Sequence, residues 1–171
     1  MKSTFQRNLA IGFGFSLFLL IISAVASYIS IGNLVSSAES VEHTNQMLHY
    51  LDDAISYMKD AETGQRGYLI TGDESFLEPY RGAEDSIRKN IRAFRNQSTD
   101  NPVQQAAAEE LFKVSNLRMA VLNDNIVKKR RGQALTTEDM NRGKVHMAES
   151  RRLIDEMKDR ERLLLTQRTE K

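Results

Sequence analysis

Few residues in this chain are suited to catalysis or metal binding. The only histidines are His43, His49 and His146, and cysteine is absent. Because His43 and His49 stand six residues apart, about 240° around a helix, they do not share a face. No carboxylate is spaced to complete a zinc motif, and neither a G-x-S-x-G turn nor a glycine-rich phosphate loop is present. We therefore expect no catalytic residue, no metal site and no cofactor.

The charge of the chain bears on the class of partner. With 24 basic and 23 acidic residues the net charge is +1, so no overall field favours nucleic acid. One basic run, residues 128–131, lies where a helix is predicted to end, and the helix dipole favours cations there. We interpret this run as a solvated helix end and expect no nucleic-acid partner.

Four polar residues are the main candidates for a functional site. Glu62 and Gln65 fall on the apolar seam of a predicted helix, where an unpaired carboxylate would cost free energy. Arg66 follows Glu62 by four residues, the favourable spacing and order for an ion pair on one helix. Arg118 falls on the inward side of a later helix, from which it can reach Glu62. Two interpretations stay open: a buried polar layer that sets helix register, or a ligand pocket built on the same side chains.

Two glycines interrupt the same predicted helix. Gly64 and Gly67 each cost roughly 1 kcal/mol of helix propensity relative to alanine. We expect another backbone segment or a side chain to approach the helix closely at these positions, because such contacts explain why a side chain is missing.

The elements that position these residues are predicted to be helical. Proline occurs only as Pro79 and Pro102, whereas alanine, leucine, glutamate, lysine, arginine and glutamine are abundant. No window alternates polar and apolar residues long enough to predict a strand. The composition and the periodicity together predict an all-α protein.

An uncharged segment near the N-terminus predicts a transmembrane helix. Residues 9–31 carry no charge and would extend about 34 Å as a helix, compared with a hydrocarbon core of roughly 30 Å. Lys2 and Arg7 precede this segment, and the first charge after it is Glu39. The positive-inside rule therefore predicts a cytoplasmic N-terminus, with the bulk of the chain outside.

The predicted organisation has three parts: residues 1–8 in the cytoplasm, 9–31 in the inner (cell) membrane, and 33–171 as an extracytoplasmic domain. A cleavable signal peptide is the alternative, with residues 9–23 as its apolar region and Ala24-Val25-Ala26 as its cleavage site. Apolar residues continue past that site, which favours an uncleaved anchor. Both alternatives export the remaining chain.

Helical periodicity predicts four helices after the membrane segment. The first runs from about residue 33 to 71, and Gly72 provides its C-terminal stop. The second is predicted to begin between Asp73 and Pro79, with either Asp73 as its cap or Ser75 and Glu78 as a capping box. Its predicted inward residues are Phe76, Tyr80, Ala83, Ile87, Ile91 and Phe94.

The third helix is predicted to run from Pro102 to about residue 131, where Gly132 ends it, and Thr136 or Thr137 caps the fourth. Short connections give an up-down antiparallel four-helix bundle. Because the first and fourth helices are the longest, residues 72–75 and 132–137 are expected at the membrane-distal tip. Other predicted core residues are Val41, Thr44, Leu48, Leu51, Ile55, Met58, Leu69, Ala107, Leu111, Val114, Val121, Leu122, Met140, Met147, Ile154, Met157 and Leu164.

Residues 60–80, DAETGQRGYLITGDESFLEPY, resemble the signature of the CHASE type-three domain, a cyclase- and histidine-kinase-associated sensory extracellular domain. The resemblance extends over residues 33–171. The signature includes Glu62, Gly64, Gln65, Arg66, Gly67, Tyr68, Thr71 and Gly72, which together with Arg118 form the predicted signature site.

The resemblance implies the sensory part of a transmembrane receptor, most often a sensor histidine kinase of a two-component system. It also implies a second membrane span after the fourth helix and a cytoplasmic output domain, so we expect this sequence to be part of a longer protein. A small molecule or a protein would act as the stimulus, and a homodimer in the membrane is expected. The alternative is a membrane-anchored helical adaptor or a chemotaxis-type receptor fragment that binds a protein partner.

Overall fold

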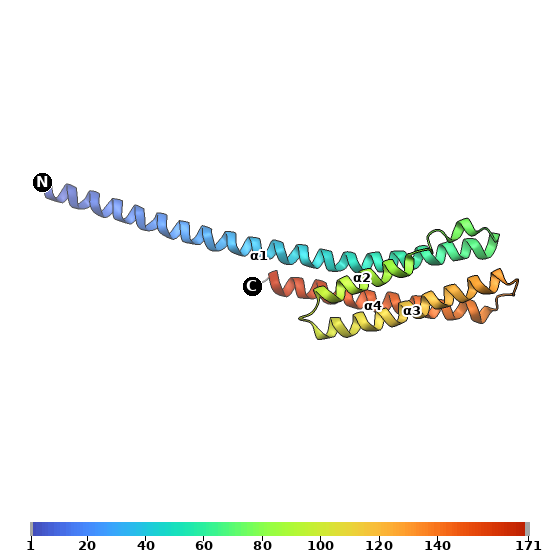
Figure 1. The fold of residues 1–171 in the computed structure, drawn as a ribbon. Helices are drawn as coiled ribbons and strands as arrows, with labels where there is room; N and C mark the ends of the chain where they lie inside the picture. The colour runs from blue at the N-terminus through green and yellow to red at the C-terminus, as the bar shows by residue number, and fades with distance from the viewer. Residues whose placement is uncertain (1, 170–171) are drawn as a thin grey trace.

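The computed structural model describes residues 2–169, and its side chains from residue 7 onward. It is an up-down antiparallel four-helix bundle in which one helix extends far beyond the others (Figure 1). The all-α prediction is therefore confirmed. The helices are α1 (Lys2–Thr71), α2 (Ala83–Gln97), α3 (Pro102–Arg130) and α4 (Thr137–Thr169), with a short 3-10 helix, η1 (Glu74–Leu77), between the first two.

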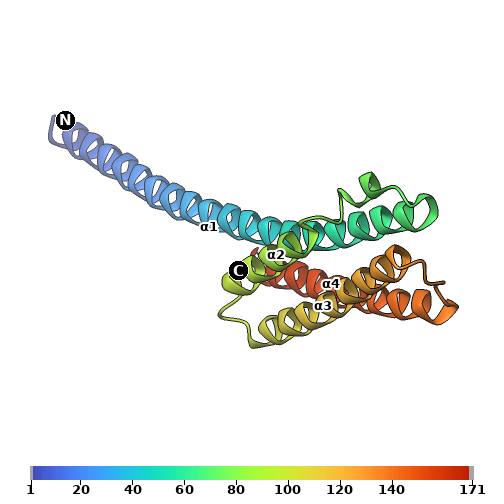
Figure 2. The ribbon, with the colours of Figure 1, turned by 45° about the vertical axis from the view of Figure 1, so that its right-hand side comes forward.

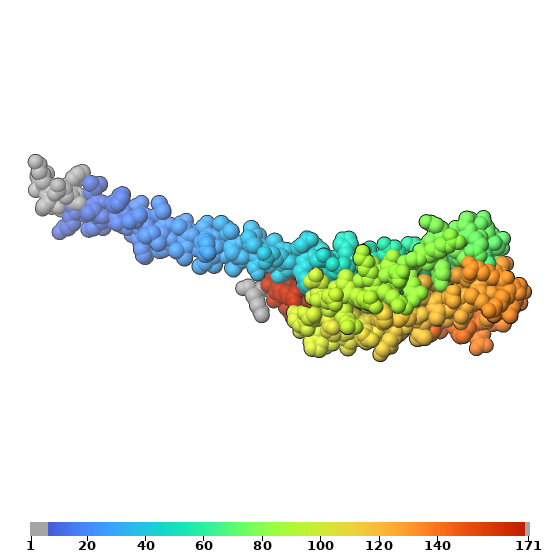
Figure 3. Space-filling model, in the orientation of Figure 1, coloured from blue at the N-terminus to red at the C-terminus, as the bar shows by residue number. Residues whose placement is uncertain are grey.

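The first helix is continuous from the predicted membrane segment to the far tip of the bundle. Its residues 7–36 are all exposed and stand clear of the other helices (Figure 3). An 18-residue window in this helix has a mean hydropathy of 2.5, and none of it is buried, so length and composition allow it to cross a membrane. One continuous helix therefore joins the candidate span to the bundle.

The prediction for the start of the second helix is wrong. Asp73 does act as a cap, since its carboxylate accepts a hydrogen bond from the Ser75 backbone N–H at 2.9 Å, but it caps η1. The chain then turns through residues 78–82, and α2 begins only at Ala83. Gly82 has a φ of 78°, a left-handed conformation that interrupts any helix running from Asp73. The predicted Ser75–Glu78 capping box is absent, because the Glu78 N–H donates to the Ser75 carbonyl in a turn.

The other helix ends follow the predicted signals. Pro102 begins α3, and Asn101 caps it by accepting a hydrogen bond from the Gln104 N–H at 3.1 Å. Gly132 follows the end of α3 with a φ of 70°. Thr136 caps α4, because its hydroxyl oxygen accepts from the Asp139 N–H at 3.2 Å.

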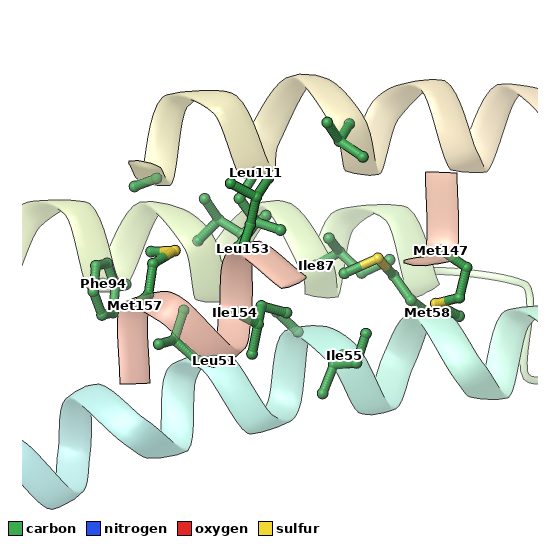
Figure 4. Packing of buried hydrophobic residues seen from close by; sticks show 14 of the residues in the cluster. Leu51, Ile55, Met58, Ile87, Phe94, Leu111, Met147, Leu153, Ile154 and Met157 are labelled. Atoms are coloured by element: carbon green, nitrogen blue, oxygen red, sulfur yellow. The ribbon is translucent and has the colours of Figure 1, made fainter. Parts of the chain in front are cut away.

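The main hydrophobic core runs along the axis of the bundle and is built from all four helices (Figure 4). Three predicted core residues are instead exposed: Val41 by 40%, Phe76 by 44% and Met140 by 59%. Val41 lies before the bundle covers α1, Phe76 lies on the surface segment after α1, and Met140 lies in the first turn of α4. The largest fully buried apolar side chains are Met47, Leu51, Met58, Leu77, Ile87, Phe94, Leu111, Leu122, Ile126, Ile154 and Met157.

The late start of α2 changes the packing at the tip. Along the bundle the backbone of α1 lies against both α2 and α4, whereas no Cα atom of α2 lies within 8 Å of a Cα atom of α4 among residues 2–169. Beyond the start of α2, a second cluster of Tyr68, Leu77 and Ile126 joins α1 and η1 to α3. The connections at residues 72–73 and 131–136 lie at the tip (Figures 1 and 2), and α4 returns along α1 past the α2–α3 turn (Figure 1).

Candidate functional site

A partly buried ion pair joins the first and third helices in the tip half of the bundle. The Nη2 atom of Arg118 lies 2.8 Å from Oε2 of Glu62. The Arg118 side chain is only 5% exposed, whereas that of Glu62 is 26% exposed. Burial lowers the pKa of the Arg118 guanidinium, and the adjacent Glu62 carboxylate partly counteracts this effect. An arginine nevertheless stays protonated, so the pair holds two opposite charges.

A glycine on the fourth helix makes room for this arginine. A Cβ atom added to Gly143 would collide with Nη1 of Arg118 and would lie 3.3 Å from its Cζ. Gly143 is buried in the second turn of α4, inside the helix, where glycine is unfavourable. Gly143 was not predicted as a site residue, although an isolated glycine inside a predicted helix is the same signal that identified Gly64 and Gly67. Three helices thus shape the surroundings of one guanidinium group.

Two further signature side chains, Gln65 and Arg66, differ in their burial. Gln65 is 4% exposed, and its Nε2 donates a hydrogen bond to the carbonyl oxygen of Leu122 at 3.3 Å. Arg66 lies 3.9 Å from Glu62, but its side chain is 74% exposed. Arg66 is therefore not part of a buried layer, because its phase on α1 turns it to solvent. The buried part of the predicted layer consists of Gln65 and Arg118, with Glu62 half-buried at its edge.

The two signature glycines of α1 lie against the segment that follows this helix. A Cβ added to Gly64 would lie 2.6 Å from the carbonyl oxygen of Phe76, and one added to Gly67 would collide with the Phe76 ring. The close approach predicted from the sequence is therefore present. These glycines allow residues 74–79 to fold back onto α1, which places the 3-10 turn at the tip.

The remaining signature residues end α1 and stabilise the tip. Tyr68 is 4% exposed and packs with Leu77, while Arg130 of α3 stacks over its ring at 5.9 Å. The Thr71 hydroxyl donates to the Gly67 carbonyl at 2.8 Å, and Gly72 has a φ of 77°. Thr71 and Gly72 are exposed, so they are not members of a buried layer. Their position at the end of the helix turns both toward solvent.

A groove opens beside the ion pair, between α1 and α4, with α3 as its floor. Its volume is about 770 Å³. The lining residues belong to α1, α3 and α4: Glu62, Gln65, Arg66, Leu69, Ile70, Arg118, Asn125, Met140, Asn141, Lys144, Met147, Ala148 and Arg151. Three of the predicted site residues of α1, together with Arg118, therefore share one concave surface, whereas Gly64, Gly67, Tyr68, Thr71 and Gly72 do not line it.

Another ion pair, this one between α1 and α4, lies nearer to the membrane segment. Lys158 of α4 pairs with Asp52 of α1, and the Lys158 side chain is only 14% exposed. The neighbouring buried residues Leu51 and Ile154 belong to the same two helices and to the main core. α1 and α4 are therefore joined by charge as well as by apolar packing.

The comparisons with known proteins identify a family for most of the chain. A family model described as the CHASE3 domain matches residues 37–171. This domain is an extracellular sensory domain found in histidine kinases and cyclases. The chain matched no curated protein and no solved structure.

Proposed function

The chain belongs to the CHASE3 family of extracellular sensory domains, and from this premise we propose that it passes a stimulus inward by displacing α1 against α4. The bundle would lie outside the inner membrane, anchored by the apolar part of α1. The output would be a cytoplasmic domain that follows a second membrane span, and we propose a histidine kinase of a two-component system as that output.

The observation that carries this proposal is the continuity of α1. Its 70 residues correspond to about 105 Å of helix, with the candidate membrane segment at one end and the candidate site at the other. A continuous helix packed along a core transmits a shift or rotation better than a jointed one. A change at Glu62 therefore has a direct mechanical route to the membrane.

The fourth helix is the natural counterpart of α1 in such a movement. It contacts α1 along the bundle and extends past the α2–α3 turn toward the membrane segment (Figure 1). In the proposed receptor, α4 leads into the second membrane span. Small displacements between two packed helices are a recognised way to bias a two-state output.

We further propose that two such chains pair in the membrane. Before Thr44 the first helix lacks the cover of the bundle, and Leu34, Val35 and Val41 are exposed by 70%, 52% and 40%. Anchoring in a membrane confines the helices to two dimensions and holds them parallel, which raises their effective concentration. The contact would then follow the membrane-proximal part of α1.

A topology reporter tests the location on which this function depends. A periplasmic phosphatase fused after residue 100 should be active, and a cytoplasmic fluorescent reporter at the same position should be dark. Mass spectrometry of the mature protein distinguishes the uncleaved anchor, in which Ala26 is retained, from a signal peptide. A fusion after residue 100 that is active only in the cytoplasm would exclude an extracytoplasmic sensor.

A further inference from the structure

We propose that the groove between α1, α3 and α4 binds a small organic carboxylate that carries an apolar portion and a hydrogen-bond donor. This inference rests on the proposed sensory function, because it assigns a class of stimulus to that domain. It depends on three independent properties of the groove: its charge, its unpaired buried atoms and its apolar rim.

The charge of the lining favours an anion. Four cationic side chains line the groove, those of Arg66, Arg118, Lys144 and Arg151, and Glu62 is the single carboxylate. Four positive charges and one negative charge leave an excess of three positive charges. Lys144 and Arg151 are exposed and have no ion-pair partner among residues 7–169, so both are free to bind a ligand anion.

Two residues that line the groove each have a buried polar atom without a hydrogen-bond partner within residues 7–169. These atoms are Nε of Arg118, a donor, and Oδ1 of Asn125, an acceptor. The two residues are only 4% and 5% exposed, and both line the groove. Buried polar atoms in folded proteins nearly always have a partner, and each unpaired one is unfavourable. A ligand carboxylate would accept from Arg118, and a ligand hydroxyl would donate to Asn125.

Apolar side chains beside these polar atoms indicate an organic ligand. Ile70 of α1 is 83% exposed and Met140 of α4 is 59% exposed, while Met147 of α4 is buried. The volume of about 770 Å³ lies within the range of pockets that hold small organic molecules, roughly 300–1,000 Å³. Methionine side chains adapt readily to the shape of a ligand. An inorganic anion would leave this apolar surface unused.

The position of the groove connects binding to the proposed movement. A carboxylate that binds Arg118 would compete with Glu62 for the guanidinium. Within residues 7–169, Glu62 is the only residue of α1 that forms an ion pair with Arg118. The same ligand would contact Lys144 and Arg151 on α4. Binding would therefore exchange a link between α1 and α3 for a link through the ligand to α4.

A titration of methionine methyl groups tests the proposal on the full chain in detergent micelles. Met140 and Met147 line the groove, and Met147 also belongs to the main core. Met47, Met58 and Met157 belong to that core without lining the groove and serve as reference signals. The probes are mandelate, benzoate and hexanoate, each beside its uncharged amide, with sulfate as an inorganic control. We expect saturable shifts of Met140 and Met147 with at least one of the carboxylates, strongest for mandelate, and none with the amides.

Matched variants separate a local site from general attraction to positive charge. The double variant Lys144→Ala/Arg151→Ala removes two exposed cations from the groove, and Lys89→Ala/Arg92→Ala removes two exposed cations from α2. We expect the first to weaken mandelate binding about tenfold or more and the second to change it less than about twofold.

Three outcomes would overturn the proposal: no saturable shift with any carboxylate, equal shifts with the amides, or equal weakening by both double variants. Methionine shifts with sulfate alone would show that the groove binds an inorganic anion, and this result would also contradict the proposal. These results are independent of the topology reporter. If the titration fails while the periplasmic reporter is active, only the proposed ligand class is excluded. If the reporter is active in the cytoplasm, the proposed sensory function itself is excluded.

Discussion

Lys158 of α4 donates a hydrogen bond to Asp52 of α1, although the lysine is nearly buried and the aspartate is 57% exposed. This pair lies between the candidate site at the tip and the membrane segment, on the two helices that are proposed to move. Because of this position, the pair reports how α1 is placed against α4. The ion pair of Arg118 and Glu62 has the corresponding role at the tip, between α3 and α1.

The ion pair at the tip should contribute to the stability of the bundle. Glu62→Ala leaves the buried Arg118 guanidinium without its carboxylate, so we expect the free energy of unfolding to fall by about 1–3 kcal/mol. Glu62→Gln should cost less, because it keeps an acceptor. Arg66→Ala is the control, since an ion pair at 3.9 Å with an exposed arginine should be worth less than about 0.5 kcal/mol. Denaturant unfolding followed by circular dichroism measures all three; equal effects of Glu62→Ala and Arg66→Ala would contradict the assignment.

The signature glycines should be intolerant of a methyl group. In Gly64→Ala the new Cβ meets the Phe76 carbonyl oxygen, a backbone atom that cannot rotate away, so we expect a loss of about 1–3 kcal/mol. Gly32→Ala on the same helix is the control. Nothing lies within 4 Å of its added Cβ, so alanine there should be neutral or stabilising by up to about 1 kcal/mol. Thermal unfolding of both variants in micelles makes the comparison; a stable Gly64→Ala would mean that the tip segment does not pack as described.

Acid should weaken the tip through Asp139. A hydrogen bond from Lys128 and two from Thr136 hold the pKa of this carboxyl well below its usual range. A carboxyl whose pKa is lower in the folded state stabilises the fold above its unfolded pKa of about 4 and loses this contribution as the pH falls. The melting temperature should therefore drop between about pH 5 and pH 2, and Asp139→Asn should flatten this part of the curve.

The control for the acid experiment is Asp53→Asn. Asp53 is exposed and forms no ion pair among the described side chains. This variant should keep the slope of the parent. An Asp139→Asn protein with the parental slope would show that other carboxyl groups govern the acid response.

Chains should pair along the membrane-proximal part of α1. Single cysteines placed through residues 33–50 should crosslink between protomers in membranes with a helical period, strongest near Leu34 and Val41, which are exposed. The chain has no native cysteine, so each crosslink reports one position. Absent crosslinks, or crosslinks without a period, would favour a monomeric membrane-anchored adaptor.

Local signals in the sequence predicted the helix ends and the contact of Arg118 with Glu62. Pro102, Gly132 and Thr136 mark helix ends where their residue types indicated, because caps and stops depend on neighbouring residues, whereas Asp73 caps η1 and not the second helix. The contact of Arg118 with Glu62 followed from the inward phase of both residues.

Tertiary contacts account for what the sequence did not predict. The segment before Ala83 packs against Gly64 and Gly67 as a turn, so the expected start of α2 was wrong. Met140 has the spacing of a core residue, but it lies at the rim of a groove that exists only once α1, α3 and α4 assemble. The space that Gly143 leaves for Arg118 likewise depends on how α3 meets α4.

The most direct test of the proposed movement locks α1 to α4 in a receptor with a measurable output. Residues 1–169 would be joined to the second membrane span and kinase domain of a characterised sensor histidine kinase. Cysteines would replace Asp52 and Lys158, which contact each other, and a bifunctional maleimide would bridge them. We predict that the bridge shifts kinase activity away from that of both single-cysteine controls treated with the same reagent. Kinase activity that is unchanged by a complete bridge would contradict signalling by displacement of α1 against α4.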